Sequence, residues 1–166
     1  VMTNGVFYTC KVEPLYEGHR TTLGEIVANT PREEITEEFY IPEAGAIRES
    51  WEYQKGGKRE ERVSRDGFVY MYSEGGMNFP DPLDAPSRTI ITSEGGSAPS
   101  RFKHVIEDPV THRLRRLVPT ELEQLDMFPV NHTQGESDTK RAFFMGNALV
   151  CGIVERVGIE LGIREW

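Results

Sequence analysis

The spacing of apolar residues changes near position 118, and this change constrains the fold of the chain more than any other feature. Before it, apolar residues gather in short β-branched and aromatic runs, such as residues 68–72, which Gly and Pro separate. After it, Val150, Ile153, Val157 and Leu161 recur at the helical period. We therefore expect an α+β fold, in which a small, loop-rich and mainly antiparallel β module precedes two or three helices.

The first two thirds of the chain predict several strands and one short helix. The sequence Glu107-Asp108-Pro109 between two of the strands predicts a hairpin turn. Thr30-Pro31-Arg32-Glu33 is a capping box with proline at the first helical position, which predicts a helix to about Phe39. The expected strands are residues 5–12, 68–72, 88–92, 102–106 and 111–117, with a loop or hairpin tip at 54–66 and an irregular connection at 74–87.

Length, apolar runs and cysteines exclude several classes of protein. The 166 residues fit one domain or part of one. The longest apolar runs cover about four residues, such as 148–151, whereas a membrane-spanning helix needs about 20, so we expect no membrane partner. Cys10 and Cys151 lie far apart without metal-ligand spacing, which favours neither a disulfide framework nor a metal site. A reduced, cytoplasmic setting is expected, and no secretory leader is visible.

The charge is unevenly distributed along the chain. The formal net charge is -8, yet residues 87–118 contain six Lys and Arg against three Asp and Glu. This basic strip has two interpretations, a solvated strand face or a short surface that contacts a polyanion. Its cations are Arg88, Arg101, Lys103, Arg113, Arg115 and Arg116.

Three ordered blocks resemble parts of the cytosine-5 DNA methyltransferases. Residues 116–129 (RLVPTELEQLDMFP) and 142–150 (AFFMGNALV) are similar to the ninth and tenth sequence blocks of that family. Upstream, residues 88–90 (RTI) and 93–96 (SEGG) resemble the Thr-Ile dipeptide and the glycine-rich loop of its target recognition domain. The order and spacing of the blocks agree, and the resemblance covers about residues 68–162.

The resemblance implies the C-terminal part of a bacterial restriction–modification enzyme, with a target recognition domain at 1–118 and a helical segment at 119–166 that returns to the catalytic domain. The Pro-Cys nucleophile, the Glu-Asn-Val block, the Gln-x-Arg-x-Arg block and the glycine-rich S-adenosyl-L-methionine motif of the family do not occur here. We therefore expect no catalytic residue and no activity from this chain alone. The implied partners are double-stranded DNA with a specific cytosine-containing site and an N-terminal α/β catalytic half.

The resemblance also implies roles for particular residues. Asn147 and Ala148 would lie at the start of the last helix and contact the carboxylate of S-adenosyl-L-methionine, although the chain alone is not expected to bind it. A plain helix cap is the alternative for Asn147. Arg116 and Glu121 are expected to form a structural ion pair. The DNA-contacting candidates are Arg88, Thr89, Thr92, Ser93, Glu94, Gly95, Gly96, Ser97, Arg101, Lys103 and Arg113, for which turns and solvated charges are the alternatives.

Three residues within the ninth block depart from the family pattern. Val118 replaces a capping threonine, and Gln124 and Met127 replace an arginine and a glycine. Because Thr120 and Glu123 form another capping box, we expect Thr120 to cap the helix instead.

Leu149, Val150, Ile153, Val157 and Leu161 are expected to pack on the absent catalytic half and to leave an exposed apolar stripe here. Two other identities stay open, a separately encoded recognition subunit of a split methyltransferase and a non-catalytic DNA-binding module. The DNA sequence recognised does not follow from the residues.

Overall fold

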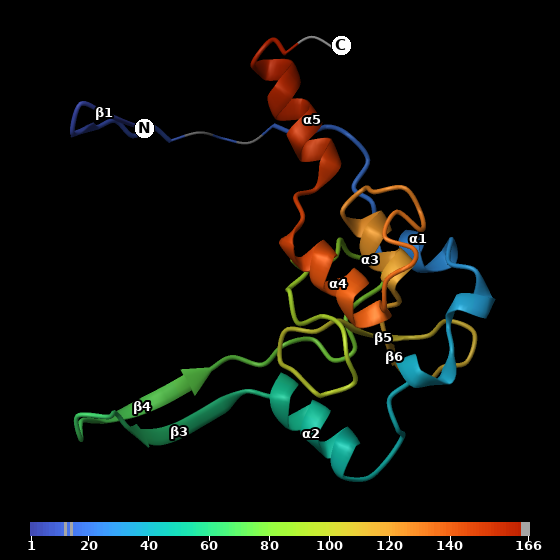
Figure 1. Ribbon diagram of the computed structural model, residues 1–166. Coiled ribbons are helices and arrows are strands. Elements are labelled where there is room, and N and C mark those ends of the chain that lie inside the picture. The colour runs from blue at the N-terminus through green and yellow to red at the C-terminus, as the bar shows by residue number, and fades with distance from the viewer. Residues whose placement is uncertain (12, 14, 164–166) are drawn as a thin grey trace.

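The computed structural model describes residues 1–11, 13 and 15–163, and its fold is the expected mixture of α-helices and short antiparallel sheets (Figure 1). Each of the three sheets is a two-stranded hairpin. The strands are β1 (Met2–Thr3), β2 (Val6–Phe7), β3 (Lys58–Val63), β4 (Val69–Glu74), β5 (Val105–Glu107) and β6 (Leu114–Arg116). The α-helices are α1 (Leu23–Ala28), α2 (Ala46–Lys55), α3 (Pro119–Leu125), α4 (Asp138–Asn147) and α5 (Cys151–Glu160).

The main core lies where α1, α3 and α4 pack around the β5–β6 hairpin. Leu23 from α1, Ile106 from β5, Leu122 from α3 and Met145 from α4 are all buried in one cluster. A smaller cluster on the other side of β5 holds Trp51 of α2. The core therefore joins segments from both sides of position 118, although their sequence periods differ.

The β5–β6 hairpin confirms the predicted hairpin, with strands shorter than the expected 102–106 and 111–117, and α3 confirms the helix expected after Val118. Val105 pairs with Arg116, and Glu107 pairs with Leu114. At α3, however, Val118 occupies the N-cap position and Thr120 does not cap. The backbone N–H of Val118 donates to Glu121 Oε2 at 2.9 Å, while the Thr120 hydroxyl donates to the carboxylate of Glu34. The Glu121 carboxylate therefore engages the backbone N–H of the N-cap residue, and Thr120 does not supply the predicted cap.

The expected helix from residue 30 to 39 is wrong. The structure has two short 3₁₀ turns there, Arg32–Glu34 and Glu37–Phe39, and the helix of this region is the earlier α1. The capping box of α1 consists of Thr22 and Glu25. Thr30 follows α1 and its hydroxyl donates to a carbonyl of the last turn, at 3.2 Å. Thr30 therefore closes one helix and does not open another.

The N-terminal and central strands agree only in part with prediction. Within residues 5–12 only β2 is a strand, and residue 12 lies outside the described residues. Residues 88–92 form no strand, because they lie as an extended segment against α4 and have no strand partner in the described part of the chain. The loop expected at 54–66 instead contains the end of α2 and all of β3, so only its alternative, a hairpin tip, is confirmed around 64–68.

The β3–β4 hairpin extends away from the body of the molecule, and residues 58–74 are named the arm (Figure 1). None of these residues is buried. Strand β4 agrees with the strand predicted at residues 68–72. The helix that leads into the arm, α2, was not predicted. It packs on the body through Trp51, which is 1% exposed.

Candidate nucleic-acid interface

The glycine-rich loop, residues 92–97, lies against helix α4. A Cβ atom on Gly146 of α4 would come within 2.3 Å of the carbonyl carbon of Ile91, and one on Gly95 within 2.8 Å of Thr139 Cα. Gly96 adopts a φ of +77°, in the left-handed region that favours glycine. Two of these three glycines thus allow close packing of the loop on a helix, and the third forms the turn.

A buried network supports the loop from below. Glu94 is 4% exposed, and its Oε1 lies 2.9 Å from His104 Nδ1. The other ring nitrogen of His104 lies 3.0 Å from Ser87 Oγ. The Lys103 ammonium donates to the carbonyls of Gly96 and Ala98 at 3.0 and 2.8 Å, and its burial lowers its pKa. Glu94 and Lys103 therefore position the loop from inside.

The other cations of the basic strip also donate to internal oxygens. Arg88 pairs with Asp81 at 2.7 Å and donates to the carbonyl of Phe102 at 3.0 Å. Arg101 donates to carbonyls at the end of α2 and pairs with Glu74 of β4 at 3.2 Å. Neither of the two interpretations of the strip anticipated that these cations would brace loops.

The exposed groups of this region are mainly hydroxyls. The side chains of Thr89, Thr92, Ser93 and Ser97 belong to exposed residues on the outer side of the loop. Arg113 lies at the surface on β5–β6, where it pairs with Glu37 and its guanidinium lies 4.3 Å from the Tyr40 ring centroid. The surface that could meet a ligand here is therefore polar and offers donors and acceptors more than free charge.

The expected Arg116–Glu121 ion pair is wrong, because Arg115 makes it. Arg115 donates to both carboxylate oxygens of Glu121, at 2.7 and 2.8 Å. Arg116 instead donates to the carbonyls of Gly96 and Glu38, at 2.9 and 2.6 Å. Successive strand residues point to opposite faces, so a shift by one residue exchanges the two partners. Arg116 and Glu121 both remain buried structural residues.

A groove of about 850 Å³ opens between α3, α4, α5 and the segment before the loop. Asp126 lies on its wall, is 6% exposed, and has no hydrogen-bond partner for Oδ2 among the described residues. Burial raises the pKa of this carboxyl to about 6. The groove is otherwise largely apolar, with Ile26, Ile90, Leu125, Met145, Ile153 and Val157 among its lining residues.

Asn147 does not begin the last helix, so its predicted capping role is wrong. It ends α4, where its side-chain N–H donates to the carbonyl of Phe143 at 2.9 Å, and α5 has Val150 at its N-cap position. The end of a helix presents carbonyls and negative dipole to an approaching group. The arrangement at Asn147 and Ala148 thus differs from the helix N-terminus that would attract a carboxylate.

Residues 138–160 are long enough to span a membrane and contain an 18-residue window with a mean hydropathy of 1.5. Residues 148–150 divide them into α4 and α5, of ten residues each. Each helix is about 15 Å long, half of the roughly 30 Å of a bilayer core. Within residues 1–11, 13 and 15–163, no cluster of three or more His, Cys, Asp or Glu side chains could hold a metal ion.

Fold and surface together define a small α+β module with a braced polar loop, a projecting arm and an open apolar groove. The chain is 36% identical over 161 residues to the Type II methyltransferase M.Sau3AI of Staphylococcus aureus. The match covers 97% of this chain and 36% of that protein, and it supports a relationship to a methyltransferase. No family model matches the chain, and no solved structure matches it either.

Proposed function

We propose that this chain is the C-terminal portion of a DNA (cytosine-5-)-methyltransferase of a bacterial restriction–modification system. The observation that carries the proposal is the similarity to a methyltransferase over nearly the whole chain, which spans only about a third of that relative. The three ordered blocks at residues 88–96, 116–129 and 142–150 favour the cytosine-5 family. The protein would act in the cytoplasm on double-stranded DNA.

In this function, residues 1–118 select the DNA sequence. The exposed hydroxyls of Thr89, Thr92, Ser93 and Ser97 and the backbone of Gly96 contact base edges and phosphates. Arg113, which pairs with Glu37 beside the β5–β6 hairpin, adds a cation that contacts phosphate. The remaining candidates do not touch the DNA themselves but hold the loop in place, and their internal contacts support this role. They are Arg88, Glu94, Gly95, Arg101 and Lys103.

Residues 119–166 return the chain to the catalytic half, which covers the apolar groove. Two features support this role: α5 exposes apolar side chains such as Ile153 and Val157, at 61% and 53%, and the relative continues well beyond the length matched here. Asp126 then receives a hydrogen-bond donor or a cation from the covering segment, which restores the pairing it lacks. Residues 164–166 of this segment lie outside the described residues.

S-adenosyl-L-methionine would supply the methyl group in the complete protein. Ala148 lines the groove and Asn147 does not, and both lie at the C-terminal end of α4, which offers carbonyls to the carboxylate of the cofactor where a helix N-terminus would offer N–H groups. The residues present therefore do not by themselves fit the group, and the pocket would come mainly from the catalytic half. No methyl transfer is expected from this chain alone.

Methylation of a duplex by the full-length protein tests this function. We expect 5-methylcytosine at one sequence context in plasmid DNA, detected by bisulfite sequencing, when the complete protein is supplied with S-adenosyl-L-methionine. The 166-residue chain should give none. If the complete protein methylates adenine, or no DNA at all, the proposal is wrong.

The same assay separates the split-subunit alternative. If the chain is encoded separately, co-expression with a candidate catalytic subunit should restore methylation that neither chain shows alone. A chain that binds DNA but supports no methylation with any upstream segment would instead be a non-catalytic module.

A further inference from the structure

The arm is an exposed two-stranded ribbon with a well-defined register. Its strands pair from Lys58 with Glu74 to Val63 with Val69, six residue pairs in all. Such a ribbon is about 20 Å long. Phe68 and Met71 are 69% and 52% exposed, so the arm carries large apolar side chains without a core of its own. Isolated two-stranded hairpins are only marginally stable in water, and exposed apolar surface of this kind marks interaction sites.

The base of the arm is fixed to the body. Arg101 donates to the carbonyls of Gln54 and Gly56, both at 3.2 Å, and to the carbonyl of Gly75. It thereby ties both ends of the arm to the segment that follows the glycine-rich loop. The buried Trp51 anchors the preceding helix. Arg101 and Trp51 therefore fix the direction in which the arm leaves the body.

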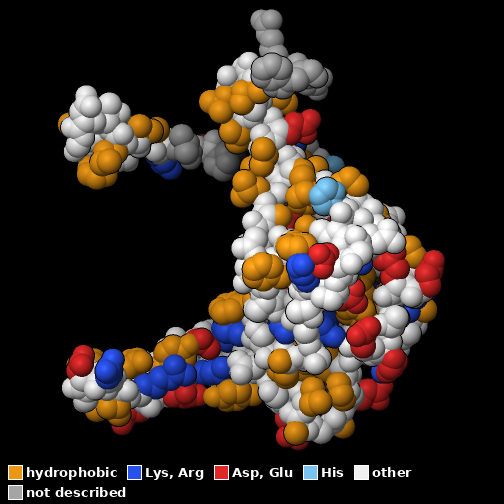
Figure 2. Space-filling model, viewed as in Figure 1, with side chains coloured by type: hydrophobic (Ala, Val, Ile, Leu, Met, Phe, Trp, Pro, Cys, Tyr) orange, Lys and Arg blue, Asp and Glu red, His pale blue; other side chains and the backbone are white. Residues whose placement is uncertain are grey.

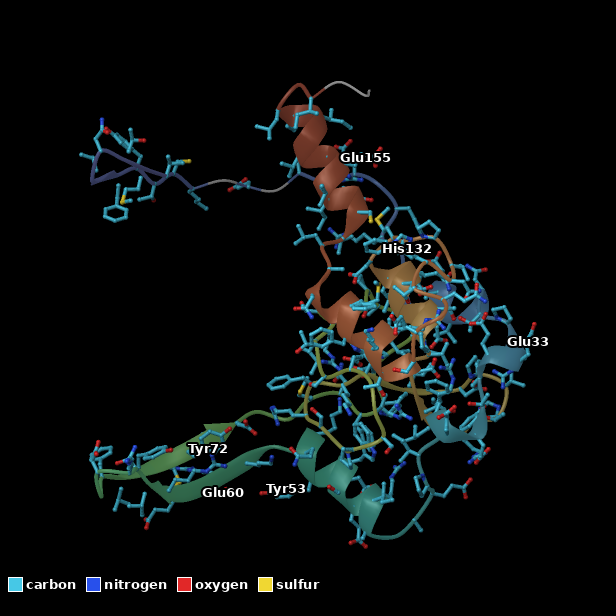
Figure 3. All side chains as sticks on the ribbon, viewed as in Figure 1. Glu33, Tyr53, Glu60, Tyr72, His132 and Glu155 are labelled. Carbon is cyan, nitrogen blue, oxygen red and sulfur yellow. The ribbon has the colours of Figure 1, made fainter. Side chains whose placement is uncertain are left out.

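One face of the arm combines an arginine with tyrosines. Arg62 lies with its guanidinium carbon 3.5 Å from the ring centroid of Tyr72, its Nη2 donates to Glu60 Oε2 at 3.3 Å, and its side chain stays 42% exposed. A guanidinium stacked on a ring keeps N–H groups at its edge for bidentate hydrogen bonds. Figure 3 shows Tyr53, Glu60 and Tyr72 on and beside the arm, and the Tyr53 hydroxyl donates to Glu60 at 2.9 Å. Both carboxylates on this face are thus already engaged, Glu60 by Tyr53 and Arg62, and Glu74 by Lys58 and Arg101.

The arm also holds cations that are not committed to the body. Arg59 and Arg65 belong to exposed residues and have no ion-pair or hydrogen-bond partner within the part of the chain that the structure describes. Figure 2 shows a row of Lys and Arg side chains along the arm that continues onto the body. Because Arg88, Arg101 and Lys103 of the body donate to internal oxygens, the cations of the arm are better placed to meet phosphates.

We propose that the β3–β4 arm enters the major groove of duplex DNA and reads part of the target sequence. The major groove, about 12 Å wide, admits a two-stranded ribbon. Arg62 then meets base edges, Phe68 at the tip offers an apolar surface to thymine methyl groups, and Arg59 and Arg65 contact phosphates on either side. This inference rests on the proposed function and assigns base recognition to a second element besides the glycine-rich loop.

The test uses the full-length protein and a duplex library randomised at its centre, with binding measured at several salt concentrations. Arg62→Ala should weaken binding to the selected sequence about 5- to 100-fold and relax preference at one position or adjacent positions. Arg62→Lys, which keeps the charge but loses the planar fork, should relax the same positions. Arg59→Ala combined with Arg65→Ala should weaken all sequences alike and lower the salt slope by about 2.

The matched control removes two exposed arginines elsewhere, Arg20 and Arg156, by Arg20→Ala combined with Arg156→Ala. We expect this variant to keep the selected sequence and most of the salt slope. Arm variants that select the same sequence with wild-type affinity would overturn the inference and leave the proposed function standing. A wild-type protein that selects no sequence contradicts the proposed function, and the inference falls with it.

Discussion

Arg115 places a full positive charge inside the core, at a site with 0% exposure. Two carboxylates compensate it, Glu121 with two hydrogen bonds and Asp108 at 2.9 Å. Burial opposes the charge on Asp108, yet hydrogen bonds from Arg32, Arg115 and backbone N–H groups outweigh it and hold its pKa well below the usual range. The network joins β6, α3 and the turn of the β5–β6 hairpin.

Replacing Arg115 should therefore leave two buried carboxylates short of a partner. We expect Arg115→Ala to lower the free energy of unfolding by about 3–5 kcal/mol, as measured by urea denaturation. Arg113→Ala, on the same strand region but paired with Glu37 at the surface, should cost less than about 1 kcal/mol. Equal losses for the two variants would contradict this assignment.

Asp126 should make the stability of the isolated chain depend on pH. Its pKa is raised from 3.8 to about 6 by burial, so the protonated form favours folding, and this contribution is lost as the pH rises through 6. Asp126→Asn should raise the free energy of unfolding by about 3 kcal/mol at pH 8 and have little effect near pH 4. Urea titrations at both pH values measure this. The exposed Asp84→Asn should show no such difference between them.

At the scale of elements, the packing of α4 on the glycine-rich loop depends on glycines, which have no side chain. Gly146 faces the backbone of Ile91 and Gly95 faces that of Thr139, so the helix and the loop approach as closely as two backbones can. This contact places a helix beside Ile91 and Thr92, at the end of the segment 88–92 where a strand was expected. The β-branched sequence of the segment predicts extended backbone, and only the neighbouring helix decides what it pairs with.

Gly146→Ala should therefore destabilise the protein by about 1–3 kcal/mol, because the new methyl group overlaps a backbone that cannot move freely. Gly158→Ala is the matched control, since Gly158 also lies in a helix, α5, and has open space around its Cβ position. That control should stabilise the protein by up to about 1 kcal/mol through helix propensity. Thermal denaturation of the two variants compares them, and a neutral Gly146→Ala would argue against the close contact.

Over the whole molecule, the apolar residues in and beside α5 confirm the expected exposed stripe within the described residues. Leu149, Ile153, Val157 and Leu161 are 73%, 61%, 53% and 71% exposed, while Val150 is half-buried. Apolar residues at the helical period indicate a face to be buried, and their exposure here indicates that the covering surface lies elsewhere.

The isolated chain should consequently self-associate through this stripe. Ile153→Glu combined with Val157→Glu places two charges on it, and we expect sedimentation velocity to show a shift from oligomers to monomer. Glu155 lies outside the groove lining and is labelled in Figure 3, so Glu155→Lys should leave the association unchanged. A wild-type chain that stays monomeric at high concentration would contradict the expectation.

The sequence alone determined the features that depend on near neighbours. Apolar periodicity and turn residues give the α+β class, the β5–β6 hairpin and the start of α3 at Pro119, because local backbone preferences act over a few residues. The resemblance of the ninth and tenth sequence blocks likewise depends only on their residues and on their order along the chain. The same reasoning missed α4, whose apolar residues 142–145 are consecutive and do not recur at the helical period, and it placed a cap at Asn147 where a helix ends.

Only the tertiary structure decided what the charged residues do. Arg116 donates to a carbonyl 78 residues away, at Glu38, and Arg101 to one 26 residues away, at Gly75. A charge count cannot distinguish such a brace from a free phosphate contact, because both use the same side chain. Which arginine pairs with Glu121 depends on which strand face meets α3, and that is set by the packing of the whole core.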